Sequence, residues 1–173
     1  MKLYDWSVAF LQSTNDNSLK WINRGHDAAC YFKAIENVEK YGQNKIKVAP
    51  HIILGLPGET REDMLFTVLQ STQSPVVKGL KLHHLQIHNC TPLEKIYAEN
   101  PFPLLSVEKY IEITADIIAK LPRDLVLFRL FTTAPAEYLI APKWNLGTQE
   151  ALRKFEEYLD ANHITQGCQR CME

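Results

Sequence analysis

The sequence lacks several features that would place it in a special class of protein. It has no run of about 18 apolar residues able to span a bilayer, and its N-terminus has no basic-then-apolar signal pattern. Only four residues of 173 are cysteines, and they are too few and too scattered to form the disulfide framework of a secreted domain. The net charge is −1, so charge gives no argument for nucleic acid or an anionic membrane as a partner. We therefore expect a cytoplasmic protein.

The composition is that of an ordinary globular protein, with 46% apolar and 23% charged residues, and the length fits one domain. Short apolar runs alternate with segments of helical periodicity. The expected strands cover residues 6–11, 47–54, 79–88 and 125–131. The expected helices cover about 16–22, 27–41, 61–73, 91–99 and 106–121, and a last one starts near 148. This alternation predicts parallel βαβ units and an α/β fold.

The most informative segment is His51–Thr60, with the sequence HIILGLPGET. Its aliphatic run reads as a buried strand, and the two glycines permit a tight turn that approaches a ligand closely. Thr60 and Asp63 then form a helix-opening capping box. A strand, a glycine turn and a helix N-terminus make up the C-terminal rim of a βα unit, where α/β folds place their ligands.

A further motif, LQSxNDxxLxxINRGHD, precedes HIILGLPGET in the chain. Together they resemble the later part of the radical S-adenosylmethionine (SAM) enzymes, and most of all a subgroup similar to the oxygen-independent coproporphyrinogen oxidases. Pro92-Leu93, Phe128–Leu130 and Leu139–Pro142 also look like that subgroup. The resemblance covers about residues 6–146.

The resemblance implies a partial (βα)6 barrel with the active site at the C-terminal ends of its strands. A CxxxCxxC loop there holds a [4Fe–4S] cluster, which cleaves SAM reductively to methionine and a 5′-deoxyadenosyl radical. This chain contains no CxxxCxxC. We therefore expect residues 1–146 to form the later half of such a barrel and 147–173 a C-terminal helix and tail. The cluster ligands would lie in a segment outside this chain, and the chain alone would be inactive.

The resemblance also implies site residues in the first motif. Gln12 matches a glutamine that contacts SAM, and its amide can bond a ribose hydroxyl or the methionine part. Ser13 either adds a hydrogen bond or caps the next helix. Arg24 matches an arginine that pairs with the carboxylate of SAM, although an arginine at a helix C-terminus is also favourable by itself. The chain would thus supply the adenine and ribose side of the SAM site and part of the substrate cavity, with a substrate that the sequence does not identify.

Ile53, Gly55 and Leu56 match the strand motif that lines the adenine through backbone groups. The family pattern is GxIxGxxE, and here His51 replaces its first glycine while Glu59 comes one position late. Glu59 is therefore not expected in the adenine site. His51 points either into the barrel or toward the outer helices. A lone histidine in an apolar strand is usually a core residue with a satisfied ring, which is the first expectation for His51, and an active-site role is the alternative.

Expectations for several other residues follow from their places in the expected strands and helices. Arg129 interrupts an apolar strand, so we expect a carboxylate partner or an anionic ligand. His83 and His84 alternate in direction, which argues against a metal trio with His88. Cys30 follows two alanines on an expected helix and is assigned to core packing.

The remaining cysteines include Cys168 and Cys171, spaced like half of a zinc or redox site. With His163 they supply three ligands at most, and zinc needs four, so an unliganded tail is expected.

Two other functions remain open. One is a cluster-free binding or interaction module on a residual half-barrel. The other is a different α/β enzyme that uses the glycine turn for a phosphate, which the lack of a nearby lysine or general base weakens. A half-barrel would also leave its first strand as an exposed edge, and this predicts self-association.

Overall fold

The protein is built around a four-stranded parallel sheet. The computed structural model describes residues 5–132 and 134–170. The sheet order is β1-β2-β3-β5, and all three strand pairs are parallel. The strands are β1 (Asp5–Gln12), β2 (Ile46–Leu54), β3 (Gly79–His84) and β5 (Val126–Arg129). This architecture confirms the predicted α/β fold of parallel βα units.

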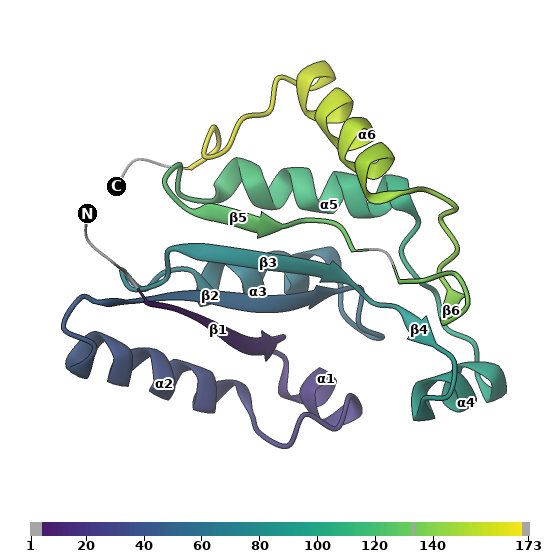
Figure 1. The fold of residues 1–173 in the computed structure, drawn as a ribbon, viewed down its shortest axis with the longest axis horizontal. Helices are drawn as coiled ribbons and strands as arrows, with labels where there is room; N and C mark the ends of the chain where they lie inside the picture. The colour runs from purple at the N-terminus through teal and green to yellow at the C-terminus, as the bar shows by residue number, and fades with distance from the viewer. Residues whose placement is uncertain (1–4, 133, 171–173) are drawn as a thin grey trace.

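Helices cover one face of the sheet and leave the other open (Figure 1). In the view of Figure 1, α3 lies behind β2 and β3, while α2 and α5 flank the two edges of the sheet. The helices are α1 (Asp16–Trp21), α2 (Ala28–Tyr41), α3 (Arg61–Ser71), α4 (Pro92–Glu99), α5 (Val107–Lys120) and α6 (Thr148–Ala161). Side chains cap five of the six N-termini, and the capping box expected at Thr60 and Asp63 is present.

The hydrophobic core lies between the sheet and the helices. Alternate strand residues face the helices and are fully buried: Ile52, Leu54, Leu80 and Leu82. Each such side chain contributes about 1.5–3 kcal/mol relative to an exposed one. Tyr110 of α5 is also fully buried. The core therefore holds the sheet from one side only, as in half of a barrel.

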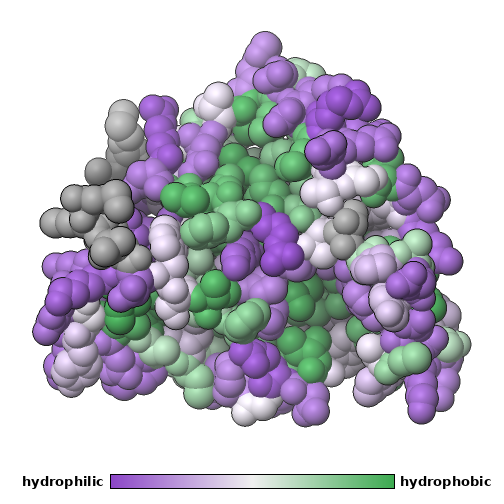
Figure 2. Space-filling model, in the orientation of Figure 1, coloured by the Kyte–Doolittle hydropathy of each residue, from purple (hydrophilic) through white to green (hydrophobic). Residues whose placement is uncertain are grey.

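On the open face the strands present a mixture of aromatic and basic side chains. Trp6, Phe10 and Phe128 are 42%, 52% and 45% exposed. Figure 2 looks onto this face and shows hydrophobic and hydrophilic residues interspersed across its centre. In a closed barrel this face would point inward.

The third strand is shorter than predicted, which corrects the expected range of 79–88. β3 stops at His84, and Ile87–His88 form a separate short strand, β4, that pairs antiparallel with β6 (Leu139–Ala141). The cause is the end of β2 at Leu54. The Leu85 amide donates the last bond to the Leu54 carbonyl, and no neighbour remains beyond it.

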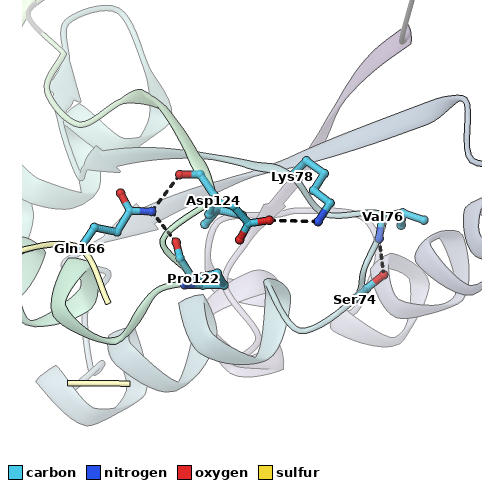
Figure 3. Close-up of polar contacts among 7 residues, drawn as sticks. Ser74, Val76, Lys78, Pro122, Asp124 and Gln166 are labelled. Carbon is cyan, nitrogen blue, oxygen red and sulfur yellow. Dashed lines mark hydrogen bonds and ion pairs between the residues drawn. The ribbon is translucent and has the colours of Figure 1, made fainter. Parts of the chain in front are cut away.

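The N-terminal end of the sheet is closed by polar contacts (Figure 3). Lys78 and Asp124 lie 3.3 Å apart and join the starts of β3 and β5. The Gln166 amide donates to the carbonyl oxygens of Pro122 and Leu125, which fastens the segment after α6. In barrels this end serves stability, while ligands bind at the opposite end.

Cys30 is exposed, so the expectation that it packs in the core is wrong. The buried stripe of α2 runs through Ala28, Tyr31 and Ile35, and Cys30 lies off that stripe. Cys168 is also exposed, and Cys171 lies outside the described residues.

β1 is an edge strand that pairs only with β2 in the described part of the chain, as predicted. Whether this edge mediates self-association stays a prediction. Among the described residues, no helix combines the length and apolar character needed to cross a bilayer.

Candidate functional site at the C-terminal ends of the strands

The segments that follow β1 and β2 lie side by side at the C-terminal rim. The Ser13 hydroxyl donates to the Glu59 carboxyl at 2.5 Å. The Thr14 and Thr67 hydroxyls lie 2.8 Å apart. Gln12 is in register with Ile52, three residues before Gly55. The structure therefore brings the two predicted SAM-binding segments to the same rim.

Gln12 occupies a strained position. The β1–β2 register shifts between Phe10 and Gln12, and Gln12 has a φ of +74°. Its side-chain Oε1 is buried and has no hydrogen-bond partner. A non-glycine residue in the left-handed region costs about 1–3 kcal/mol and is concentrated at functional sites, as are β-bulges. The buried amide oxygen is therefore an acceptor without a donor among the described residues, which is rare in native proteins.

Arg24 is anchored beside Gln12. Its Nε and Nη2 both donate to the Phe10 carbonyl, at 3.2 and 2.5 Å. The Arg24 amide donates to the Leu19 carbonyl and terminates the turn after α1. The guanidinium has more N–H groups than this carbonyl accepts, so it retains donors for an anionic ligand. The carbonyl contact, invisible in the sequence, fixes the guanidinium at the end of β1.

The glycine turn has the backbone that its sequence predicts. Gly55 and Gly58 have φ values of +84° and +83°. The Gly55 amide points to Met64 Sδ at 3.1 Å, and the Glu59 amide closes the turn on the Leu56 carbonyl at 3.1 Å. A Cβ on Gly55 would lie 2.8 Å from Leu105 Cδ1, so only glycine fits this position without displacing its neighbour.

The other two predicted contact residues, Ile53 and Leu56, differ in their exposure. Ile53 is half-buried and in register with His83 of β3, on the open side of the sheet. Leu56 is only 2% exposed. Any ligand contact of Leu56 would therefore be made by its backbone groups, as the resemblance implies.

Glu59 belongs to this rim, although its sequence spacing argued against it. Burial raises the pKa of its carboxyl, and hydrogen bonds from Ser13 and Ser18 oppose that shift. The carboxyl links the β1 and β2 segments across 46 residues of chain. The capping box that positions Glu59 was readable in the sequence, but its Ser13 partner was not.

A cavity of about 420 Å³ opens beyond the ends of β3 and β5. It lies in the size range of small-molecule pockets. Trp144 in its wall donates from Nε1 to the Leu105 carbonyl at 3.0 Å, and Leu105 packs over Gly55. The cavity is thus adjacent to the rim. Its lining comprises His84, Gln86, Thr132, Ala134, Ala136, Leu139, Pro142, Lys143, Trp144, Asn145, Leu146 and Gly147.

A hydrogen-bonded chain of alternate residues fixes His84 at the base of this cavity. His88 Nε2 donates to Gln86 Oε1 at 3.3 Å. Gln86 Nε2 donates to the Thr132 carbonyl at 3.1 Å and to His84 Nε2 at 2.9 Å. His84 therefore carries its proton on Nδ1, which is buried with no partner. The alternation of polar residues at 84, 86 and 88 was the available sequence signal for this network.

Burial lowers the pKa of His84 to about 4, so its ring is neutral at pH 7. The ring stacks on Trp144 at a centroid distance of 3.8 Å and an interplanar angle of 26°. Tyr110 meets it edge-on at 5.4 Å. The neutral ring is thus a rigid part of the wall.

We predict that the protein loses stability as the pH falls from about 6.5 toward 4. An unfolded histidine binds its proton near pH 6.5, whereas folded His84 does so only near 4. Between these values the unfolded chain binds more protons, so acid favours unfolding. Urea unfolding at several pH values should show this slope, and it should be shallower in His84→Phe, which keeps a ring against Trp144. An identical slope in both proteins would contradict the assignment.

A second group of basic side chains lies on the open face of the sheet. The rings of His51 and His83 are 4.2 Å apart by centroid. Burial is the main cause that lowers the pKa of His83 to about 3, followed by the positive charge of His51 and Arg129. Burial likewise lowers the pKa of His51. His51 Nε2 is buried without a partner, so the expectation of a satisfied core ring is wrong.

For Arg129, the expected carboxylate partner is not found among the described residues, and the alternative of an anionic ligand stays a prediction. Arg129 is exposed, and its Nη1 donates to the Thr132 hydroxyl at 3.0 Å. The strand is too short and too close to the sheet edge to bury it. Among residues 5–132 and 134–170, no group of three or more His, Cys, Asp or Glu could hold a metal ion.

Residues 77–161 match the family model of the radical SAM C-terminal domain. The chain is 30% identical over 166 residues to YtqA of Bacillus subtilis. The matched region covers 96% of this chain and 50% of that protein. It is 27% identical over 166 residues to a tRNA uridine(34) acetyltransferase of Dehalococcoides mccartyi, covering 94% of this chain and 34% of that protein. The chain therefore spans half or less of the length of these relatives.

The fold matches that of Elp3 from the archaeon Methanocaldococcus infernus, solved with residues 1–46 deleted. The TM-score is 0.79 at 19% identity, over 94% of this chain and 37% of that one. The parallel sheet matches the C-terminal half-barrel of that structure. Sequence and fold together relate the chain to the radical SAM superfamily.

Proposed function

We propose that this chain supplies the adenine and ribose side of a SAM site and part of the adjoining substrate cavity. The observation that carries the proposal is Gln12. Its left-handed backbone and its buried, unpaired Oε1 lie at the same rim as the Gly55 turn. Strain and an unsatisfied buried acceptor are costs that a ligand offsets.

Each rim residue has a role in this proposal. Gln12 accepts from a ribose hydroxyl, and Arg24 pairs with the carboxylate of the methionine part. Gly55 and Leu56 offer backbone groups to the adenine, with Ile53 beside them on the open face. Ser13 and Glu59 hold the two rim segments together through their 2.5 Å hydrogen bond.

The redox chemistry requires a group that these residues do not hold. A [4Fe–4S] cluster, when bound, supplies the electron that cleaves SAM to methionine and a 5′-deoxyadenosyl radical. No set of described residues fits a cluster. We propose that its ligands come from a CxxxCxxC segment outside these 173 residues, since the relatives are about twice as long.

The cavity beside the rim is the substrate site in this scheme. His84, neutral and held by Gln86, and the Trp144 ring form a rigid part of the wall next to the place where the adenosyl group would lie.

Calorimetric titration with SAM tests the proposal. Gln12→Ala and Arg24→Ala should each weaken SAM binding about tenfold or more, because each removes a hydrogen bond to a charged or buried group. Lys20→Ala removes the same charge as Arg24→Ala from the neighbouring helix α1 and should leave the affinity unchanged.

Unchanged affinity in both rim variants would remove the assignment. Complete absence of SAM binding in the wild type would instead favour the cluster-free interaction module on the same half-barrel. That alternative retains the open face and the edge strand β1 as its binding surfaces.

A further inference from the structure

Four basic residues meet at the centre of the open face, and we call them the basic cluster: His51, Lys81, His83 and Arg129. Lys81 of β3 is directly opposite His51 of β2 on one side and Arg129 of β5 on the other. The His51 and His83 rings lie 4.2 Å apart. Lys81 and Arg129 carry like charges, and like charges placed directly opposite one another in a sheet are destabilising, so this pair costs the fold energy.

No acidic group compensates the basic cluster within the described chain. The charges that act on His51 come from Arg129 and Lys81, and those that act on His83 come from His51, Arg129, His84 and Lys81. All of them are basic. The neighbouring side chains on the face are rings: Phe10 lies 5.2 Å from His51, and Lys81 lies 5.8 Å above Phe128.

Two ring nitrogens of the basic cluster are also unpaired. Nε2 of His51 and Nε2 of His83 are both buried without a hydrogen-bond partner. Buried polar atoms are nearly always paired in native proteins, so two orphans at one place indicate a missing partner. When each Nε2 carries the proton of its ring, the partner that satisfies both donors and neutralises Lys81 and Arg129 at once is an anion with several acceptor oxygens.

We propose that the basic cluster binds a phosphate group of the substrate. Arg129 and Lys81 supply two neighbouring positive charges, and the several oxygens of a phosphate group can accept from both at once. Arg129 also donates to the Thr132 hydroxyl, and Thr132 lines the 420 Å³ cavity beside the SAM rim. The phosphate would therefore lie on the sheet face, with the rest of the substrate extending into that cavity. This inference rests on the proposed function, because it takes that cavity as the substrate site.

Two kinds of substrate carry such a group, phosphorylated small metabolites and polynucleotides, and the probes separate the two. Ribose 5-phosphate represents a monoester, a short single-stranded oligoribonucleotide represents diesters, and ribose is the matched neutral control. Binding to the 173-residue chain is followed through the imidazole NMR signals of His51 and His83. Ribose 5-phosphate or the oligonucleotide should shift these signals and ribose should not, and the tighter of the two binders identifies the source.

Variants of the basic cluster make the test specific. Lys81→Gln and Arg129→Gln should each weaken binding of the phosphate probe about tenfold or more, the usual scale for a charge-assisted hydrogen bond. Lys45→Gln changes an exposed lysine before β2 and should not weaken it. Both cluster variants should unfold at the same or a higher urea concentration than the wild type, because each relieves repulsion between like charges.

The outcomes separate this inference from the SAM proposal. SAM affinity should be unchanged in Arg129→Gln, and the phosphate response should be unchanged in Gln12→Ala. Equal shifts with ribose, an equal loss in Lys45→Gln, or unchanged binding in both cluster variants would overturn the phosphate site. A lower unfolding midpoint in both cluster variants would also count against it, since it would indicate a structural role.

Discussion

Tyr110→Ala is expected to lower the free energy of unfolding by about 3–5 kcal/mol. Tyr110 is fully buried, and its hydroxyl donates to the Leu130 carbonyl at 2.5 Å. Its ring meets those of His84, Phe131 and Trp144, each at a centroid distance of 5.4 Å. Removing the ring would leave a cavity between α5, β5 and the His84 and Trp144 wall of the 420 Å³ pocket. Domains of this kind are stable by about 5–15 kcal/mol, so the loss is a large share of the total.

Urea unfolding followed by circular dichroism measures this loss. Tyr110→Phe keeps the ring and leaves the Leu130 carbonyl without its donor, which should cost about 1–3 kcal/mol. Tyr41→Ala removes a ring that is 66% exposed and should change stability by less than about 0.5 kcal/mol. A loss below about 1 kcal/mol for Tyr110→Ala would show that the aromatic cluster does not hold the fold.

Gly55→Ala is expected to destabilise the protein more than Gly58→Ala, although both glycines have nearly the same positive φ. The left-handed backbone costs an alanine about 1–2 kcal/mol at either position. Only at Gly55 does the added Cβ lie 2.8 Å from the Leu105 side chain, whereas Gly58 has open space. Overpacking adds about 1–3 kcal/mol at Gly55 alone. The difference between the two variants therefore isolates the steric term.

The Gly55 variant should also disturb the cavity wall. Leu105 accepts the hydrogen bond from Trp144, so displacing Leu105 should shift the tryptophan fluorescence in Gly55→Ala and leave it unchanged in Gly58→Ala. Equal unfolding midpoints and equal spectra for the two variants would contradict the close approach at Gly55.

The order of strands and helices was predictable because its signals are local. Asn15, Asp27, Thr60, Thr91 and Ser106 all cap helices, as side chains of their type do, and the glycine turn adopts the backbone its residues favour. Two expected strands were too long, because strand ends depend on where the neighbouring strand stops. β3 ends where its neighbour β2 ends. The residues of β3 alone do not show where that point lies.

The site was predictable only in outline. The resemblance marked Gln12, Arg24 and Gly55, but the contact of Ser13 with Glu59 joins residues 46 positions apart and depends on strand register. The basic cluster depends on register too, since Lys81 meets His51 and Arg129 only after three strands are aligned. Arg129 was read as buried because its neighbours are apolar, yet β5 is an edge strand with one face open. The prediction that Cys30 packs in the core was also wrong. The sequence around it predicts a helix, but Cys30 lies on the exposed side of that helix.

The most direct test of the account is a map of where SAM binds. Titration of the ¹⁵N-labelled chain with SAM reports on each backbone amide, even when binding is weak. The account predicts shifts concentrated at Gln12, Ser13, Gly55 and Leu56, with the N-terminal end of the sheet unaffected. Shifts confined to other parts of the chain, or none at SAM concentrations in the millimolar range, would contradict it.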